Sequence, residues 1–188
     1  MDKELKKELN RKNKKIKTDN KWIIQVIILS FILSLLLSIV SELFLTHLPI
    51  ALGIILYIIV ILIGILFDIV GVSVTSANEA IFHSMNSRKI KGAKLAVRFK
   101  KNANKVSNFC CDVIGDVCGI ISGSIAVVLA TSLSRVLNIN LFVALVLFSA
   151  ITAALTIGGK ALGKSFAINK SNLILFEFAK LVSNFYHK

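Results

Sequence analysis

The sequence contains few proline, cysteine and acidic residues. Each of these shortages restricts the kinds of structure that the chain can form. Its single proline, Pro49, falls in a predicted loop, so none interrupts the long apolar runs. Its three cysteines, Cys110, Cys111 and Cys118, lie within nine residues, which fits neither a disulfide framework nor a CxxC metal pair. We expect reduced, membrane-buried side chains there; the alternative is a soft-metal site.

Acidic residues are outnumbered, with 10 Asp and Glu against 23 Lys and Arg and a net charge of +13. A balance this basic can indicate a protein that binds nucleic acid. Nucleic-acid binding would be supported by a basic domain with interleaved aromatic residues or with a known motif. The sequence contains no such domain, and aromatic residues make up only 8% of the chain. We therefore expect no nucleic-acid partner.

Long apolar runs are what the sequence does contain. Apolar residues make up 55% of it, and they are separated from the charged residues in blocks rather than interleaved with them. About 20 apolar residues in a helix cross the hydrocarbon core of a bilayer. The blocks are residues 22–44, 50–74, 109–133 and 141–157. The predicted fold class is all-α membrane, a bundle of about four transmembrane helices.

The first block, 22–44, is predicted to be an additional, uncleaved transmembrane helix. It is longer than the apolar region of a signal peptide and lacks a small-residue cleavage site. A basic segment, 1–21, precedes it. Residues 50–188 are expected to form one transmembrane domain with a basic loop at 83–107 and a C-terminal interfacial helix at 172–185.

The distribution of Lys and Arg predicts the topology. Nine precede the first block, eight lie between the second and third, and five follow the fourth, whereas the opposite loops contain only Arg135. Cytoplasmic loops are enriched in Lys and Arg, so both termini and the 83–107 loop are expected in the cytoplasm. Such basic segments also attract anionic lipids, which we expect as partners together with the bilayer itself.

Acidic residues within the spans are candidate functional residues. A charged side chain inside a spanning helix costs about 2.5–3.5 kcal/mol on insertion scales and needs a partner or water. The spacing of Asp68, Thr75 and Glu79 predicts one shared helix face, and Asp112 and Asp116 are one helical turn apart. Two stripes of small and hydroxyl residues extend these faces: Gly115, Gly119, Ser122 and Gly123, and Thr152, Thr156, Gly159 and Gly163, with Lys160 beside the second.

These stripes are expected to meet in an interface that is polar at its cytoplasmic end. Carboxylate and hydroxyl oxygens are ligands suited to Mg²⁺. Alternatively, Lys160 neutralises one aspartate, and the polar network only fixes helix register; the spacing does not decide between the two. No nucleophile–base pair and no phosphate-binding glycine loop is found, so the chain is not expected to be an enzyme.

Several motifs resemble the membrane domain of the CorB/CorC/CNNM (cyclin M) family. The stretch Ser76-Ala77-Asn78-Glu79-Ala80 resembles its S-x-x-E-x-A signature, and Gly92-Ala93-Lys94 resembles the Gly-Ala pair of the following basic segment. Val113-Ile114-Gly115-Asp116 is similar to its aliphatic-Ile-Gly-Asn motif. The stretch 160–167 corresponds to E-x-x-P-K-x-x-A, with Lys160 in place of the acid and Gly163 in place of the proline.

The resemblance covers about residues 52–188 and is greatest to short bacterial CorB-like proteins that lack CBS domains. It implies a homodimer in the plasma membrane with an inward-facing cavity for a dehydrated Mg²⁺, and transport of Mg²⁺ or Co²⁺. By position, Ser76 and Asp116 would be metal ligands and Glu79 a support, while Gly119 replaces a second Asn. The expected cation path comprises Ser76, Glu79, Asp112, Asp116, Ser122 and Thr156, with Lys160 as counter-charge. The rival hypothesis is a non-transporting membrane scaffold or regulatory subunit in which Lys160 neutralises the buried acids.

Overall fold

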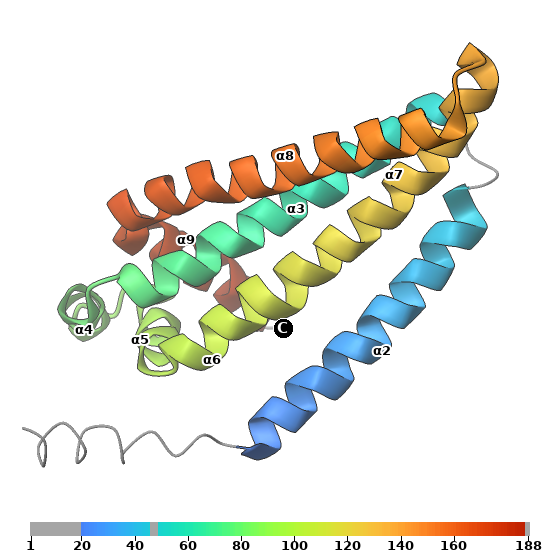
Figure 1. Ribbon diagram of the computed structural model, residues 1–188. Helices are drawn as coiled ribbons and strands as arrows, with labels where there is room; N and C mark the ends of the chain where they lie inside the picture. The colour runs from blue at the N-terminus through green and yellow to red at the C-terminus, as the bar shows by residue number, and fades with distance from the viewer. Residues whose placement is uncertain (1–19, 46–48, 187–188) are drawn as a thin grey trace, which may run out of the picture.

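The computed structural model describes residues 20–45 and 49–186, and their only regular secondary structure is helix (Figure 1). Three helical segments are long and apolar enough to cross a membrane. They are α3 (Ile50–Ser76), the segment Ala103–Leu137, and α8 (Leu141–Asn169). The middle segment consists of α6 (Ala103–Asn108), a π-helical turn η1 (Phe109–Gly115) and α7 (Asp116–Leu137). The chain is an all-α membrane protein.

The first predicted span lies in α2 (Asn20–Leu45). This helix contacts α7 and η1 and runs beside them in Figure 1. Within this helix of 26 residues, the apolar stretch Ile24–Leu36 is described with its side chains. The fourth span and the sides on which the termini lie stay predictions. Most of the predicted segment 1–21 lies outside the described residues.

The three spans pack against one another, each contacting the other two. Their shared core contains Tyr57 and Ile61 of α3 and Ile121, Ile125 and Leu129 of α7. The outward side chains of the spans are also large and apolar, as in Leu66, Phe142 and Leu147. A helix is the form in which such residues can cross lipid, because all its backbone polar groups bond within the segment.

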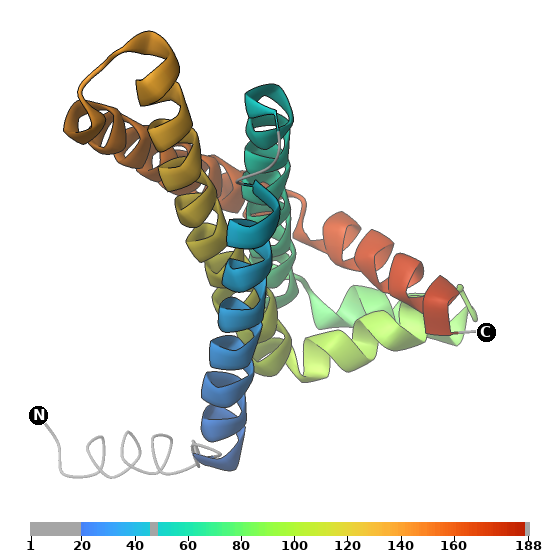
Figure 2. The same ribbon diagram turned by 90° about the vertical axis from the view of Figure 1, so that its right-hand side faces the viewer.

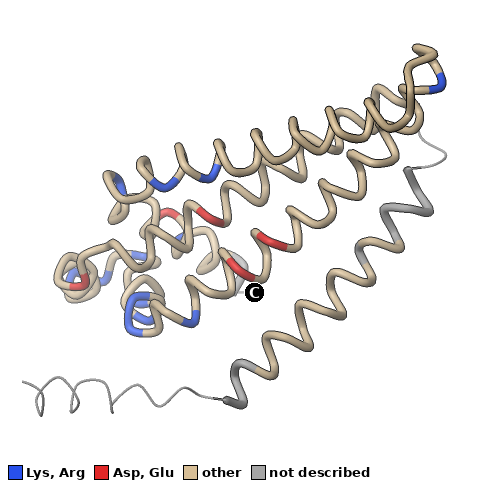
Figure 3. Tube along the Cα trace, viewed as in Figure 1, with Lys and Arg blue, Asp and Glu red and all other residues tan. Residues whose placement is uncertain are grey.

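Short helices form one end of the bundle, which we call the basic end (Figures 2 and 3). They are α4 (Glu79–Ser87), α5 (Ala93–Lys101) and α9 (Ser171–Tyr186), so most of the predicted loop 83–107 is helical. A second core joins them to α3 through Val74, Phe82, Val97 and Leu175. The predicted C-terminal helix, 172–185, lies within α9. Its position at the membrane surface stays a prediction.

Two helix boundaries differ from those expected. The helix α3 ends at Ser76, because Ala77 is extended and the Asn78 side chain accepts a hydrogen bond from the Ala80 N–H, 3.0 Å away, to begin α4. The expected single helix face from Asp68 to Glu79 is therefore wrong. At the other end, α8 continues past Gly158 and Gly159, where the apolar block was predicted to end, to Asn169.

The close approach of α3 to η1 depends on Gly71. A Cβ on Gly71 would collide with Cys111 Sγ and lie 3.1 Å from the Ser107 carbonyl oxygen. We expect Gly71→Val to lower the free energy of unfolding by about 1–3 kcal/mol, as overpacking does. Thermal unfolding in detergent measures this. Gly123→Val is the control, since nothing lies within 4 Å of a Cβ there; equal losses in both variants would contradict the prediction.

Candidate functional site

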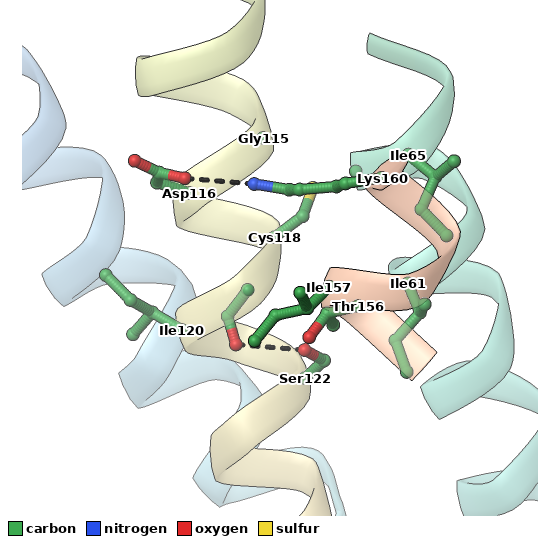
Figure 4. Close-up of a pocket in the computed structure, with 12 residues that line it drawn as sticks. Ile61, Ile65, Gly115, Asp116, Cys118, Ile120, Ser122, Thr156, Ile157 and Lys160 are labelled. Atoms are coloured by element: carbon green, nitrogen blue, oxygen red, sulfur yellow. Dashed lines mark hydrogen bonds and ion pairs between the residues drawn. The ribbon is translucent and has the colours of Figure 1, made fainter. Parts of the chain in front are cut away.

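A cavity of about 340 Å³ lies between α3, α7 and α8 (Figure 4). Its apolar lining comes from all three helices, through Ile61 and Ile65 of α3, Ile120 of α7 and Ile157 of α8. Its polar wall comes from α7 and α8. The polar residues and glycines that line it are Gly64, Gly115, Asp116, Gly119, Ser122, Thr156 and Lys160. The structure thus brings parts of both predicted stripes to one hollow.

Glycines let the helices approach closely around this cavity. A Cβ on Gly64 would lie 3.0 Å from Cys118 Cβ and 3.5 Å from the Gly115 carbonyl oxygen. A Cβ on Gly163 would lie 2.8 Å from a side-chain carbon of Ile69. The small residues therefore fix the distances of α7 and α8 from α3, as small-residue interfaces do in membranes.

An ion pair crosses the mouth of the cavity from α8 to α7. Lys160 Nζ donates to Asp116 Oδ1 over 3.1 Å, and Figure 4 shows the lysine side chain reaching across the gap. The Asp116 side chain is 65% exposed and that of Lys160 26% exposed. The bond uses one of the two carboxylate oxygens, so Lys160 neutralises Asp116 without enclosing it.

Two more carboxylates lie in the electrostatic neighbourhood of this pair. Asp112, on η1, is repelled by Asp116 and Asp68 and attracted by Lys160. Asp68, on α3, is only 4% exposed, and its Oδ2 is the one buried side-chain oxygen or nitrogen of the described residues with no hydrogen-bond partner. A buried carboxylate without a partner is costly. Three carboxyl groups, those of Asp68, Asp112 and Asp116, therefore lie near one ammonium group, that of Lys160.

The hydroxyl groups of Ser122 and Thr156 can serve only as acceptors toward the cavity. Ser122 Oγ donates to the Gly119 carbonyl over 2.9 Å, and Thr156 Oγ1 donates to the Thr152 carbonyl over 2.7 Å. A hydroxyl that has donated its proton keeps its lone pairs. Both oxygens can therefore accept from water or approach a cation.

The two predicted residues before the basic loop, Ser76 and Glu79, lie away from the cavity. Gly64 of α3 faces Gly115, which is the neighbour of Asp116. Ser76 lies twelve residues further along α3 than Gly64, which corresponds to about 18 Å of helix. The structure does not bring Ser76 and Asp116 together as ligands of one ion. Glu79 Oε1 lies 3.1 Å from His83 Nε2, at the start of α4. A place for either residue in a cation path rests on the resemblance alone.

The π-helical turn η1 does not follow from the residue pattern of the sequence. Its i→i+5 hydrogen bonds change the helical phase at Asp112, immediately before Asp116 opens α7. Isolated π turns inside α-helices occur frequently at functional sites. No residue pattern in 109–115 indicates it. The spacing of Asp112 and Asp116 therefore does not place them one regular α-helical turn apart.

The described residues contain no group of three His, Cys, Asp or Glu side chains placed to hold a metal ion. A cation in this hollow would have at most two such ligands and would keep water, hydroxyl or carbonyl oxygens for the rest. Mg²⁺ binds in this way, through one or two carboxylates and several waters. In comparisons with protein-family models, curated proteins and solved structures, no match to the chain was found.

Proposed function

We propose that the chain is a multi-pass plasma-membrane protein that transports a divalent metal cation, Mg²⁺ or Co²⁺, along the interface of α3, α7 and α8. The observation that supports this most is Asp68. Its carboxylate is buried at 4% exposure, has an oxygen without a partner, and acts electrostatically on Asp112. A passing hydrated cation would supply the interaction that this carboxylate lacks.

The acidic residues near the cavity also suit a cation. Asp116 lines the cavity, and Asp112 lies within electrostatic reach of Asp116, Asp68 and Lys160. Oxygen ligands favour Mg²⁺ over ions that prefer thiolate or imidazole. The ion is cargo in this proposal, not a resident cofactor.

The proposed topology has four spans with both termini in the cytoplasm. Its support is the distribution of 22 Lys and Arg against Arg135. Figure 3 shows most of the basic residues at the basic end, whereas Arg135 is in the last turn of α7 at the opposite end. The proposed homodimer is supported only by the family resemblance.

Binding is tested by the thermal stability of the purified protein with and without Mg²⁺. A ligand present at 100 times its dissociation constant stabilises the folded state by about 2.7 kcal/mol. We expect Mg²⁺ to raise the midpoint of unfolding, and Asp116→Asn to reduce that rise several-fold, because it removes a charge from the cavity. Glu177→Gln is the control, since that exposed acid lies on α9.

Transport itself is measured in proteoliposomes with a Mg²⁺-sensitive dye. The wild type and Glu177→Gln should give equal flux, and Asp116→Asn less. Absence of any Mg²⁺ stabilisation and flux in the wild type would contradict the proposal.

The second candidate is a membrane scaffold or regulatory subunit that moves no ion. The observation that favours it is the bond between Lys160 and Asp116, which links α8 to α7 and neutralises one carboxylate. In that function the pair fixes the register of the two helices. The two candidates differ in how Lys160 variants respond to Mg²⁺.

A further inference from the structure

A second cavity, of about 700 Å³, lies at the basic end, between α9 and the chain that leads into α5. Four cationic side chains line it, with a glycine at the start of α5 and a hydroxyl from α9. They are Lys89, Lys91, Lys94 and Arg98, with Gly92 and Ser183. We call this cavity the basic pocket.

The positive charge of the basic pocket is not offset by acids. No acidic residue lines it, and none of its four cations is within ion-pair distance of an acid in the described part of the chain. Glu177, on α9, instead lies 3.8 Å from Lys180. Four like charges around one hollow repel one another, and a bound anion would remove that repulsion.

The backbone also contributes positive electrostatic potential to the basic pocket. Gly92 is the N-cap of α5 and makes no side-chain cap, so the positive end of the helix dipole lies at the wall. Of the first three N–H groups, those of Ala93 and Leu95 donate to the Ile90 and Gly92 carbonyls. Helix N-termini bind phosphate for this reason. Gly92 has φ +90°, and a Cβ there would lie 2.9 Å from Lys180 Cα. The close contact of α5 with α9 that shapes the pocket therefore requires glycine.

The pocket lies close to the end of a membrane span. Lys100, two residues after Arg98 on α5, donates to the Val74 and Thr75 carbonyls in the last turn of α3, over 3.2 and 2.7 Å. The pocket wall also contains Ile90 and Leu95, which are apolar. Cations at headgroup depth beside apolar side chains fit a lipid, which has a phosphate joined to hydrocarbon.

We propose that the basic pocket binds the phosphate-bearing headgroup of an anionic membrane lipid. The phosphate is held by Lys94, Arg98 and the N-terminus of α5, and Lys89 and Lys91 contribute long-range attraction. Ser183 donates a hydrogen bond from α9. This site is separate from the cavity of Asp116 and does not depend on cation transport.

The experiment measures binding of fluorescent short-chain phosphatidylglycerol to the purified full-length protein in phosphatidylcholine nanodiscs. At about 1 kcal/mol per basic residue, the double variant Lys94→Gln/Arg98→Gln should bind about thirtyfold more weakly. The matched control, Lys101→Gln/Lys164→Gln, removes the same charge from exposed positions outside the pocket and should stay within a few-fold of wild type. Gly92→Ala should weaken binding with no change in net charge.

Three results would overturn the proposal. Equal losses in the pocket and control variants would show general attraction to a basic surface. Unchanged binding in Lys94→Gln/Arg98→Gln would show that the pocket is not the site. Displacement of the lipid by an equal concentration of inorganic phosphate would show a site for soluble phosphate rather than for lipid. Unfolding midpoints of all variants, measured in the same nanodiscs, confirm that the compared proteins are folded.

Discussion

Lys160→Met should lower the thermal stability of the purified protein in EDTA, and Mg²⁺ should restore it. The substitution keeps a long apolar stem but removes the one ammonium that attracts Asp116 and Asp112. Because the pair is neither fully exposed nor buried, we expect a loss of about 1–2 kcal/mol, between the values for surface and buried ion pairs. Asp116 would then lose its ion-pair partner, and the attraction of Lys160 for Asp112 would be lost as well.

The response to Mg²⁺ separates the two proposed functions. If the hollow is a cation site, the variant has one more net negative charge and should show a larger Mg²⁺-dependent rise in unfolding midpoint than the wild type. If Lys160 is a structural counter-ion in a scaffold, the loss should persist at every Mg²⁺ concentration. Lys164→Met is the control, because Lys164 lies one turn further along α8 and is exposed; it should change neither quantity.

The sequence predicts those features that follow from composition and helical period. The apolar blocks 50–74, 109–133 and 141–157 lie within the three long helical segments, because about 20 predominantly apolar residues have few alternatives to a spanning helix. Thr156 of one predicted stripe, with Lys160 beside it, lines the same cavity as Gly115, Gly119 and Ser122 of the other. The remaining members of the first stripe, Thr152, Gly159 and Gly163, contact α3 instead. Regular helical spacing predicts which residues share a face, and glycine predicts close contact.

Features that depend on a local change of helical phase could not be predicted in this way. The π turn at Phe109–Gly115 arises within a stretch whose composition equally suits an α-helix. The end of α3 at Ser76 depends on Asn78 capping α4 and on Lys100 binding the last carbonyls from a distant segment. The continuation of α8 through Gly158 and Gly159 depends on packing of Gly159 against Ile65. These are tertiary contacts, which a single sequence does not show.

Asp68→Asn should have the opposite effect on stability from Lys160→Met. Asn has nearly the same shape as Asp but no charge, so it removes the cost of a carboxylate with an unpartnered oxygen at 4% exposure. We expect the variant to be more stable than the wild type in EDTA by about 1–3 kcal/mol, the usual cost of a buried polar group without a hydrogen-bond partner. Thermal unfolding in detergent measures the difference.

The buried Asp68 carboxylate lowers the stability of the fold. The Mg²⁺ response of Asp68→Asn therefore tests whether this residue serves cation binding instead. If Asp68 serves the cation path, its loss should abolish most of the Mg²⁺-dependent stabilisation and the proteoliposome flux while raising stability in EDTA. Glu177→Gln is the control, because Glu177 is exposed on α9 and its loss should change neither the stability in EDTA nor the Mg²⁺ response. A variant that is less stable in EDTA and still responds to Mg²⁺ would show that Asp68 is structural. The carboxylates in and near the cavity would then serve helix packing, and the scaffold function would be the better explanation.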